Sequence, residues 1–370
     1  MIPDAPLLYQ RFPGLADAVE WRPLVARPTP ITTLVNFAQR HRLASLHVKR
    51  EDRTHPTSGG NKLRSLEFLL PRALARGADT LVTAGAVGSN HVASTACHAR
   101  SLGLDTVAAV VAQPPAAYAQ ANLIAGLDAG ARYIPIHPLT AVPRCLAEWV
   151  RLKLVKHRRL YYVPPGGTSP RSCLGHVDAA LELAAQVRAG VLPEPEFLFV
   201  GMGSMGTAAG LMLGCKLAGL STRVVGVVVF HRWLCTARRC AALARRTLRF
   251  LRQRDSTVPD LPLRAADLDV VTTALGGGYA HFTADAVTAA RDAYTDDGLR
   301  LDGTYTAKTL AGLLHSVDRH GLHNRRLLLW HTYGPRPAPT AAQLAAAESA
   351  LPRSLRRYLR ERQPLDEPLP

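Results

Sequence analysis

Residues 197–207 of the chain have the sequence Phe-Leu-Phe-Val-Gly-Met-Gly-Ser-Met-Gly-Thr. The apolar run 197–200 is typical of a strand that is buried on both faces, and the glycines after it allow the backbone a sharp turn. Residues 207–217 are rich in Ala and Leu, which favours a helix. A buried strand, a glycine turn and a helix in this order are the repeating unit of a doubly wound α/β fold.

The same alternation recurs on both sides of this stretch. Short runs rich in Val, Ile and Thr predict strands, and the Ala- and Leu-rich runs between them predict helices. The further expected strands are 80–84, 106–111, 133–136, 223–229 and 327–330, and the further expected helices are 62–76, 92–102 and 175–189. We therefore expect an α/β protein with a mostly parallel sheet and helices on both faces.

The length of 370 residues predicts two domains or one large α/β unit. The run Pro-Pro-Gly-Gly at 164–167 marks a change of context, which we interpret as the return from a smaller inserted domain into a larger one. We expect a large domain at 1–48 and 162–345 and a small domain at 49–161. Residues 346–370 are expected to form a C-terminal helix and tail with a loose end.

The chain is strongly basic, with 45 Lys and Arg against 28 Asp and Glu and a net charge of +17. Almost all of this charge is arginine, which fits a compositional bias as well as a surface for polyanions. The segment 232–254 is the best candidate for a nucleic-acid surface. A helix here places most of its arginines on one face and Ala244, Leu248 and Leu251 on the other. Because a solvated surface helix has the same pattern, we expect no nucleic-acid partner.

The N-terminus lacks a cationic start followed by an apolar core, and no uncharged run reaches the roughly 18 residues of a membrane span. The six cysteines include no C-x-x-C pair and no clustered histidine partners. These patterns predict a cytoplasmic protein with reduced thiols, no membrane partner and no metal site.

Ser58-Gly59-Gly60-Asn61-Lys62 precedes a run in which Leu63, Leu66 and Leu70 recur at helical spacing. The glycines allow a tight bend and Asn61 can cap the helix, so Lys62 falls in the first helical turn. The helix dipole disfavours an ammonium group there. The position therefore suits a lysine that loses its charge to form a Schiff base, although an ordinary surface lysine also fits.

Two further motifs join a strand to a helix through a glycine-bearing loop. In the first of them, Ser89-Asn90-His91 stands at the start of the expected helix 92–102, where it can cap the helix or meet a ligand. The loop 201–207 has the pattern G-x-G-x-x-G, but a dinucleotide site wants an acidic residue about 20 positions on, and 221–229 contains none. A cup for a phosphate group at a helix N-terminus explains the loop equally well, and an NADP dehydrogenase stays the weaker alternative.

In this order, the motifs resemble those of the D-cysteine desulfhydrase and 1-aminocyclopropane-1-carboxylate deaminase family. The resemblance covers about 46–334 and includes 59–62, 89–91, 165–169, 203–207, 278–279, 305–308 and 331–332. These enzymes have the tryptophan-synthase-β fold, known as fold type II of pyridoxal-phosphate enzymes. The resemblance therefore implies two open, twisted, mostly parallel sheets, pyridoxal 5'-phosphate as the cofactor, and a homodimer.

The resemblance also implies how the cofactor is held. Lys62 would form the Schiff base and act as the base near Cα, Asn90 would bind the phenolic oxygen, and Thr306 would face the pyridine nitrogen. The phosphate would lie in the loop formed by Gly203, Ser204, Met205, Gly206 and Thr207.

For a small amino-acid substrate, the implied binding residues are Ser89, Asn90, His91, Gly167 and Thr168. Tyr279 and Tyr305 would flank the substrate. Ser89 would meet the substrate carboxylate or assist proton transfer, so the catalytic set is Lys62, Ser89, Tyr279 and Tyr305.

Thr306 separates the members of this family. The cyclopropane deaminases carry a glutamate at this position, which keeps the ring nitrogen protonated, whereas a threonine hydroxyl can donate to a neutral nitrogen and gives a milder electron sink. We therefore favour β-elimination from a D-cysteine-like amino acid to a 2-oxo acid and ammonia. Ring-opening deamination and β-replacement are the alternatives.

The sequence departs from its relatives at several of these motifs. Met205 stands where relatives usually have a glycine, so a positive φ there would cost about 1 kcal/mol. Tyr333 replaces a glycine after His331 and Thr332, and Gly88, Ala93 and Ser94 replace larger polar residues. These changes leave the cofactor residues in place and alter the surroundings of the substrate.

Overall fold

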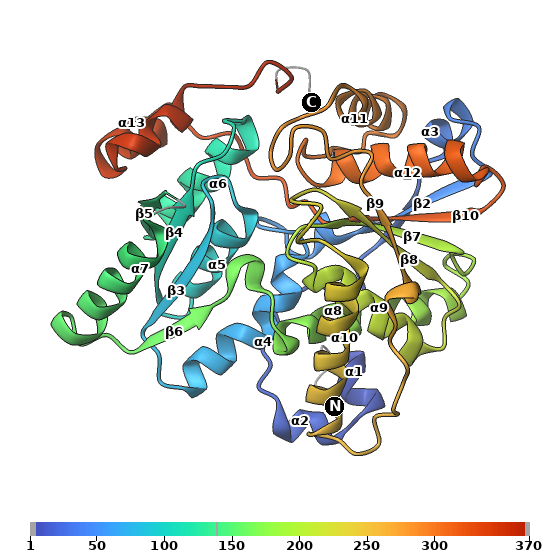
Figure 1. Ribbon diagram of the computed structural model, residues 1–370, viewed down its shortest axis with the longest axis horizontal. Coiled ribbons are helices and arrows are strands. Elements are labelled where there is room, and N and C mark those ends of the chain that lie inside the picture. Colours follow the sequence, from blue (N-terminus) through green and yellow to red (C-terminus); the bar gives the residue numbers. More distant parts are fainter. Residues whose placement is uncertain (1–4, 138–139, 367–370) are drawn as a thin grey trace. The chain divides into compact units, whose positions relative to one another are not determined.

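The structure, a computed structural model, describes residues 5–137 and 140–366 and divides into two compact units (Figure 1). Of the described residues, unit 1 contains 5–68 and 168–335, and unit 2 contains 69–137, 140–167 and 336–366. Helix α4 (Lys62–Ala75) begins in unit 1 and ends in unit 2.

Unit 1 is built on a six-stranded sheet with the strand order β1-β2-β10-β7-β8-β9. Strand β1 pairs antiparallel with β2, and the other neighbouring strands pair in parallel. The strands are β1 (Ile31–Thr33), β2 (Ser45–Arg50), β7 (Phe197–Met202), β8 (Arg223–Val228), β9 (Leu268–Val271) and β10 (Arg326–His331).

Helices cover both faces of this sheet (Figure 1). One face carries α8 (Pro170–Arg188), α9 (Gly206–Ala218) and α10 (Ala237–Arg252), and the other carries α3 (Val35–Arg40), α11 (Ala284–Asp297) and α12 (Thr306–His320). The short helices α1 (Leu7–Arg11) and α2 (Gly14–Ala18) add Leu8 and Leu15 to the first core.

The central strand β10 explains why the sheet is covered on both sides. Leu328 and Trp330 pack with α8, α9 and α10, whereas Leu327 and Leu329 pack with α11 and α12. All four side chains have an exposed fraction of 0%. Burial of each one stabilises the fold by about 2 kcal/mol before entropy is counted, so a strand of continuous apolar residues is stable only between two helical layers.

Unit 2 is built on a four-stranded parallel sheet with the order β5-β4-β3-β6. Its elements are β3 (Thr80–Ala86), β4 (Asp105–Val111), β5 (Arg132–Ile136), β6 (Leu160–Val163), α5 (Asn90–Arg100), α6 (Ala117–Asp128), α7 (Ala141–Val150) and α13 (Ala341–Ala350). Its core joins Val92, Val110 and Leu123 to Leu355 and Tyr358, which lie near the end of the chain.

The two units end at different residues from the expected domains, 1–48 with 162–345 and 49–161. Residues 49–68 belong to unit 1 because Lys49 and Arg64 form ion pairs with Glu182 of α8. Residues 336–366 belong to unit 2. They include most of the expected C-terminal helix and tail at 346–370, of which 367–370 lie outside the described residues. In that segment Tyr358 is buried, with 1% exposed.

The arginine-rich segment forms α10, an amphipathic helix. Ala244, Leu248 and Leu251 are buried in the core of unit 1, and the arginines at 238, 245, 249 and 252 are exposed. Two of them are bound within the unit, because Arg245 donates to Leu263 O (2.7 Å) and Arg252 pairs with Asp260 (3.0 Å). In the part of the chain that the structure describes, no helix has the length and apolar character needed to cross a membrane.

Candidate active site

Lys62 is the first residue of α4 and follows a bend that only glycine permits. A Cβ atom at Gly59 would lie 2.0 Å from the carbonyl oxygen of Asp52, and Gly60 has φ 115°. Asn61, at the end of the bend, donates from Nδ2 to Thr207 Oγ1 (2.8 Å). The bend therefore brings the start of α4 to the start of α9.

The surroundings of Lys62 favour its neutral form. Burial lowers the pKa of Lys62 from 10.5 to about 8, and the Cys173 thiol opposes the shift. Burial, together with the charges of Lys62 and Arg64, lowers the pKa of His176 well below its usual value, so this imidazole is neutral. A lysine amine that deprotonates readily is the group needed to attack an aldehyde or to accept a proton.

The glycine loop after β7 forms a cradle for an anion at the start of α9. Met205 is the N-cap residue, has φ 67° and gives no side-chain hydrogen bond to the first turn of the helix. Thr168 Oγ1 donates to Ser204 Oγ (2.7 Å), and a Cβ atom at Gly206 would lie 3.0 Å from Thr168 Oγ1. Helix N–H groups, hydroxyl groups and space kept open by glycine fit a phosphate group.

Met205 has φ 67°, a left-handed conformation that glycine adopts readily. A non-glycine residue in this region costs about 1 kcal/mol. The loop keeps the conformation because β7 and α9 fix both of its ends.

A buried polar network lies next to the phosphate-cradle loop, at the first turn of α9. Thr207 Oγ1 lies 3.4 Å from His176 Nε2, which is also 3.2 Å from Ser65 Oγ. The sequence gives no signal for His176, because a single histidine in a buried helix has the same pattern as an ordinary core residue.

Aromatic side chains line the edge of the loop. A Cβ atom at Gly203 would lie 3.3 Å from the Tyr305 ring, so Tyr305 packs against this glycine. The Tyr305 hydroxyl donates to the Tyr279 hydroxyl (3.4 Å). Tyr279 in turn makes an edge contact with Phe230, with the ring centroids 5.5 Å apart. Burial, and then the charge of Tyr305, raise the pKa of Tyr279 well above its usual value, so its phenol stays protonated.

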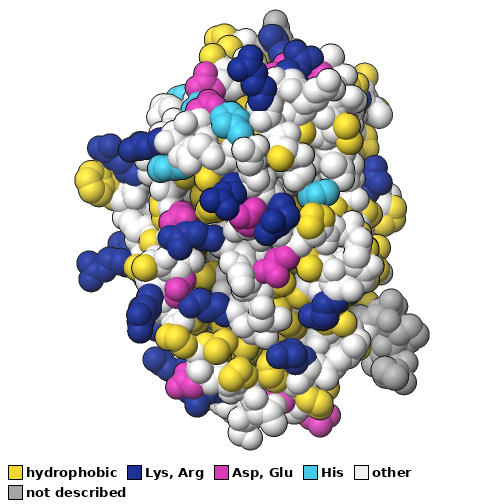
Figure 2. Space-filling view, turned by 90° about the vertical axis from the view of Figure 1, so that its right-hand side faces the viewer, with side chains coloured by type: hydrophobic (Ala, Val, Ile, Leu, Met, Phe, Trp, Pro, Cys, Tyr) yellow, Lys and Arg dark blue, Asp and Glu magenta, His cyan; other side chains and the backbone are white. Residues whose placement is uncertain are grey.

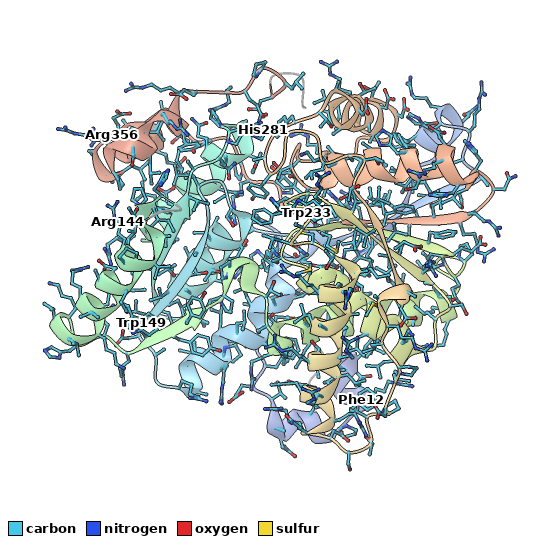
Figure 3. The ribbon with its side chains drawn as sticks, in the orientation of Figure 1. Phe12, Arg144, Trp149, Trp233, His281 and Arg356 are labelled. Atoms are coloured by element: carbon cyan, nitrogen blue, oxygen red, sulfur yellow. The ribbon has the colours of Figure 1, made fainter. Side chains whose placement is uncertain are left out.

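Phe230 lies in the loop between β8 and α10, which also carries the apolar residues Trp233 and Leu234. None of these residues was among the predicted site residues. Trp233, labelled in Figure 3, is 70% exposed, and Leu234 is 42% exposed. Large apolar side chains at the carboxyl end of a parallel strand are candidates for contact with a ligand.

Thr306 stands at the start of α12 and is bound tightly to Asp302. Its hydroxyl donates to Asp302 Oδ1 (2.7 Å) and accepts from Asp302 N (2.9 Å). The same carboxylate accepts from the backbone N–H groups of Thr304 and Tyr305. The expected donation from Thr306 to a ring nitrogen is therefore not the arrangement found, because the hydroxyl proton is used by Asp302 and Thr306 offers an oxygen lone pair.

The remaining predicted residues, which lie in unit 2, are Ser89, Asn90, His91 and Gly167. Ser89 is the N-cap residue of α5 and Asn90 is its first residue. His91 Nε2 donates to Thr83 Oγ1 (2.9 Å), whose own proton goes to Val163 O. A Cβ atom at Gly167 would lie 3.2 Å from the His91 ring, so His91 and Gly167 lie close together.

No cluster of His, Cys, Asp or Glu that could hold a metal ion occurs within residues 5–137 and 140–366. The groups that these residues do present are a buried lysine amine with a lowered pKa and a cradle of N–H and hydroxyl groups. This donor set fits the aldehyde and the phosphate of pyridoxal phosphate.

Comparison with known proteins agrees with this chemistry. Residues 23–332 match the family model described as pyridoxal-phosphate dependent enzyme. The chain is 32% identical over 334 residues to a D-cysteine desulfhydrase of Klebsiella pneumoniae (strain 342), covering 89% of this chain and 95% of the relative. It is 34% identical over 323 residues to the nocardicin C-9' epimerase of Nocardia uniformis subsp. tsuyamanensis, covering 85% and 93%.

A solved structure described as an ACC deaminase homologue is also similar. It has a TM-score of 0.73 and 28% sequence identity, and the match covers 95% of this chain and 100% of that one. The expected fold, fold type II with two mostly parallel sheets, is thereby confirmed. The matched motifs and the lysine-and-phosphate chemistry lead to one conclusion: the chain belongs to the family of pyridoxal-phosphate dependent enzymes, and pyridoxal phosphate is its cofactor.

Proposed function

We propose that the protein is a lyase that removes the β-substituent and the amino group from a small, D-cysteine-like amino acid, giving a 2-oxo acid and ammonia. The observation that carries this proposal is the Lys62 amine, whose pKa of about 8 makes it a base close to neutral pH. The 32% identity to a D-cysteine desulfhydrase supports the same reaction type. Thr306 carries no negative charge at the implied ring-nitrogen position, so even as a hydrogen-bond acceptor it stabilises a protonated ring nitrogen less than a carboxylate would, which favours elimination over ring opening.

We propose that Lys62 holds the cofactor covalently and that Asn90 and Thr306 contact its ring. The loop from Gly203 to Thr207 would hold its phosphate through the N–H groups at the start of α9 and the hydroxyl groups around them. When bound, pyridoxal phosphate withdraws electron density from the Cα–H bond of an amino acid.

The side chains of the chain itself then handle protons and orientation. The neutral Lys62 amine accepts the Cα proton. Ser89 and His91 bind the substrate carboxylate, beside Gly167 and Thr168. Tyr279 accepts a hydrogen bond from Tyr305, so its own O–H proton can pass to the departing thiolate, which leaves as a neutral thiol or hydrogen sulfide.

A second candidate function is epimerisation at Cα of a bulkier amino acid. It is favoured by the 34% identity to nocardicin C-9' epimerase and by the exposed apolar side chains of Phe230, Trp233 and Leu234, of which Phe230 packs against Tyr279. Both candidate reactions begin with proton transfer from Cα to Lys62. They differ in whether a group then leaves Cβ.

The purified protein is expected to absorb at the visible edge of the ultraviolet when it is loaded with cofactor, as a pyridoxal group bound to a lysine does. Lys62→Ala removes this band, whereas Lys153→Ala, a change at an exposed lysine of unit 2, keeps it. A wild-type protein that ignores added cofactor contradicts the assignment of Lys62.

The reaction is tested with D-cysteine, L-cysteine and the cyclopropane amino acid as separate substrates. Release of ammonia and a 2-oxo acid from a cysteine supports elimination, and release from the cyclopropane amino acid alone supports ring opening. Incorporation of deuterium at Cα from heavy water without ammonia supports epimerisation. Consumption of an added thiol with formation of a new amino acid supports β-replacement.

We also propose a cytoplasmic homodimer with reduced thiols. All six cysteines are free, and burial raises the pKa of Cys173, Cys215 and Cys240 to about 12, which keeps these thiols protonated and unreactive. Light scattering of the full chain should give twice the mass of one chain, and a monomeric mass would contradict the dimer.

A further inference from the structure

The loop that carries Ser89 and Asn90 is clamped at Gly88. Gly88 N donates to Gln113 Oε1 (3.0 Å), and Asn122 Nδ2 donates to Gly88 O (3.0 Å). A Cβ atom at Gly88 would lie 2.3 Å from that of Ala119, so α6 also fixes the position of the loop. Both backbone polar groups of one residue are thus held by buried side-chain amides.

Each of these amide residues is bound in turn by residues 336–366, here called the C-terminal segment. Arg336 Nε donates to Asn122 Oδ1 (2.8 Å). Gln113 N donates to the Tyr358 hydroxyl (2.9 Å), and the same hydroxyl donates to Gln113 O (2.7 Å). The C-terminal segment therefore reaches Gly88 by two separate routes.

Further contacts attach this segment to α6. Gln120 Nε2 donates to Leu359 O (2.6 Å), and Ala117 N donates to Asp366 Oδ2 (2.6 Å). The segment includes α13 and the helical turn Arg353–Leu359, on which Figure 3 labels Arg356. Leu351, Leu355, Tyr358 and Leu359 of the segment are buried, so its second half is anchored to the unit.

Arg336 has a second contact that leads to Asn90 itself. Its Nη2 donates to Ser94 Oγ (3.1 Å), and Ser94 Oγ donates to Asn90 Oδ1 (3.4 Å). Because Asn90 Oδ1 accepts this bond, the amide nitrogen of Asn90 is turned to donate to another partner. The phenolic oxygen of pyridoxal phosphate is an acceptor of the kind that this nitrogen would bind.

We propose that Arg336 is a positioning residue that sets the orientation of the Asn90 amide through Ser94 and holds the Ser89–Asn90 loop through Asn122. The proposal rests on the proposed role of Asn90 at the cofactor. The planar guanidinium suits this task, because its donors point in fixed directions and bridge two acceptors at once. A lysine ammonium in the same place cannot make both bonds with this geometry.

The experiment compares Arg336→Met, Arg336→Lys and Ser94→Ala with the wild type, each in the full chain loaded with pyridoxal phosphate. Arg336→Met keeps the apolar stem of the side chain and removes the donors. Arg353→Met, a change at an exposed arginine of the same segment, is the matched control. The measurements are the dissociation constant of pyridoxal phosphate, the absorption maximum of the bound cofactor and the unfolding temperature.

Loss of an oriented hydrogen bond should raise the dissociation constant about tenfold and shift the absorption maximum in Arg336→Met. Arg336→Lys should not rescue either property, Ser94→Ala should reproduce the spectral shift, and Arg353→Met should change neither. In the double variant of Arg336→Met and Ser94→Ala, the two spectral effects should not add, because both variants break the same route.

Two results would overturn the proposal while leaving the proposed function intact. One is an Arg336→Met protein that binds the cofactor with the wild-type dissociation constant and absorption maximum, even if its unfolding temperature falls. The other is a Ser94→Ala protein with an unshifted spectrum, since the route to Asn90 would then not exist. A wild-type protein with no cofactor band contradicts the proposed function itself, and the inference falls with it.

Discussion

The charge of Lys62 depends on burial, and this dependence predicts how cofactor attachment varies with pH. The amine has a pKa of about 8 instead of 10.5, so its neutral fraction rises with pH up to about 8 and then saturates. We expect the rate of pyridoxal phosphate attachment to the cofactor-free protein to rise about tenfold per pH unit below 8 and to level off above it. Stopped-flow absorbance measures this rate. A rate that climbs steadily to pH 10 would show that Lys62 titrates as an exposed lysine.

Thr306 has a structural task that can be separated from any contact with the cofactor. Its hydroxyl closes a ring of hydrogen bonds with Asp302 at the start of α12. Thr306→Val removes that hydroxyl and leaves a buried carboxylate oxygen with one donor fewer, which should lower the free energy of unfolding by about 1–2 kcal/mol. Thr306→Ser should stay within about 0.5 kcal/mol of the wild type. Denaturant unfolding of the cofactor-free protein measures both, and equal stability of the two variants would contradict this account.

Motifs identified Lys62 and the phosphate loop because glycine bends and helix starts leave a local pattern. His176 and Arg336 left none, because their roles depend on neighbours far away along the chain. Asp302 is intermediate: an acidic residue just before a helix start is a capping signal that could have pointed to its bonds with Thr306. Sequence patterns therefore found the residues that we propose bind the cofactor more readily than those that we propose position them.

At the scale of elements, the apolar strands β3, β4, β5, β7, β8 and β10 were predicted, whereas β1, β2, β6 and β9 were not. All six expected strands are present, with ends shifted by a few residues. Strand β2 was not predicted because Lys49 interrupts its apolar pattern, although the Lys49 side chain is fully buried, with 0% exposed. Its ammonium group contacts Glu182 Oε1 (2.5 Å) and Gln186 Oε1 (2.7 Å) on α8, so the charge is satisfied by an element that local sequence cannot reveal.

This buried cluster predicts an acid-sensitive contribution to stability. Burial raises the pKa of Glu182, but Arg64 and Lys49 outweigh burial and hold it at about 2, below the ordinary 4.5. A carboxyl group with a lowered pKa stabilises the folded state above pH 4.5, by about 3 kcal/mol here, and the contribution is lost as the pH falls towards 2.

Glu182→Gln should therefore lower the free energy of unfolding by about 3–5 kcal/mol at pH 7, because two buried cations lose a partner. The difference from the wild type should shrink as the pH falls from 4.5 towards 2. Glu361→Gln, a change at an exposed carboxylate, is the control and should be neutral at every pH. Denaturant unfolding over this pH range measures the difference. A gap between wild type and Glu182→Gln that is independent of pH would contradict the ionic origin.

At the scale of the whole molecule, length and element alternation predicted two parts, and tertiary contacts decided where each ends. Residues 336–366 carry no strand or glycine loop that would assign them to either part. They belong to unit 2 because Leu355 and Tyr358 fill its core and because Tyr358 bonds to both backbone groups of Gln113. Assigning them needs the complementary surface, which exists only after folding.

The net charge of +17 belongs to the whole molecule and raises the possibility that the protein binds a polyanion such as nucleic acid. Figure 2 shows Lys and Arg side chains mixed with Asp and Glu on the face that it presents, and Arg252 of α10 is paired with Asp260. Counterion release from nucleic acid requires several phosphates neutralised together by a continuous basic surface. We therefore expect no mobility shift of duplex DNA at about 0.15 M salt, and weak binding at low salt. The double variant Arg238→Glu and Arg249→Glu on α10 should reduce this weak binding no more than the control double variant Arg319→Glu and Arg325→Glu elsewhere in unit 1. Tight binding at 0.15 M salt that only the α10 pair abolishes would make this helix a nucleic-acid surface and contradict the assignment of its arginines to solvent.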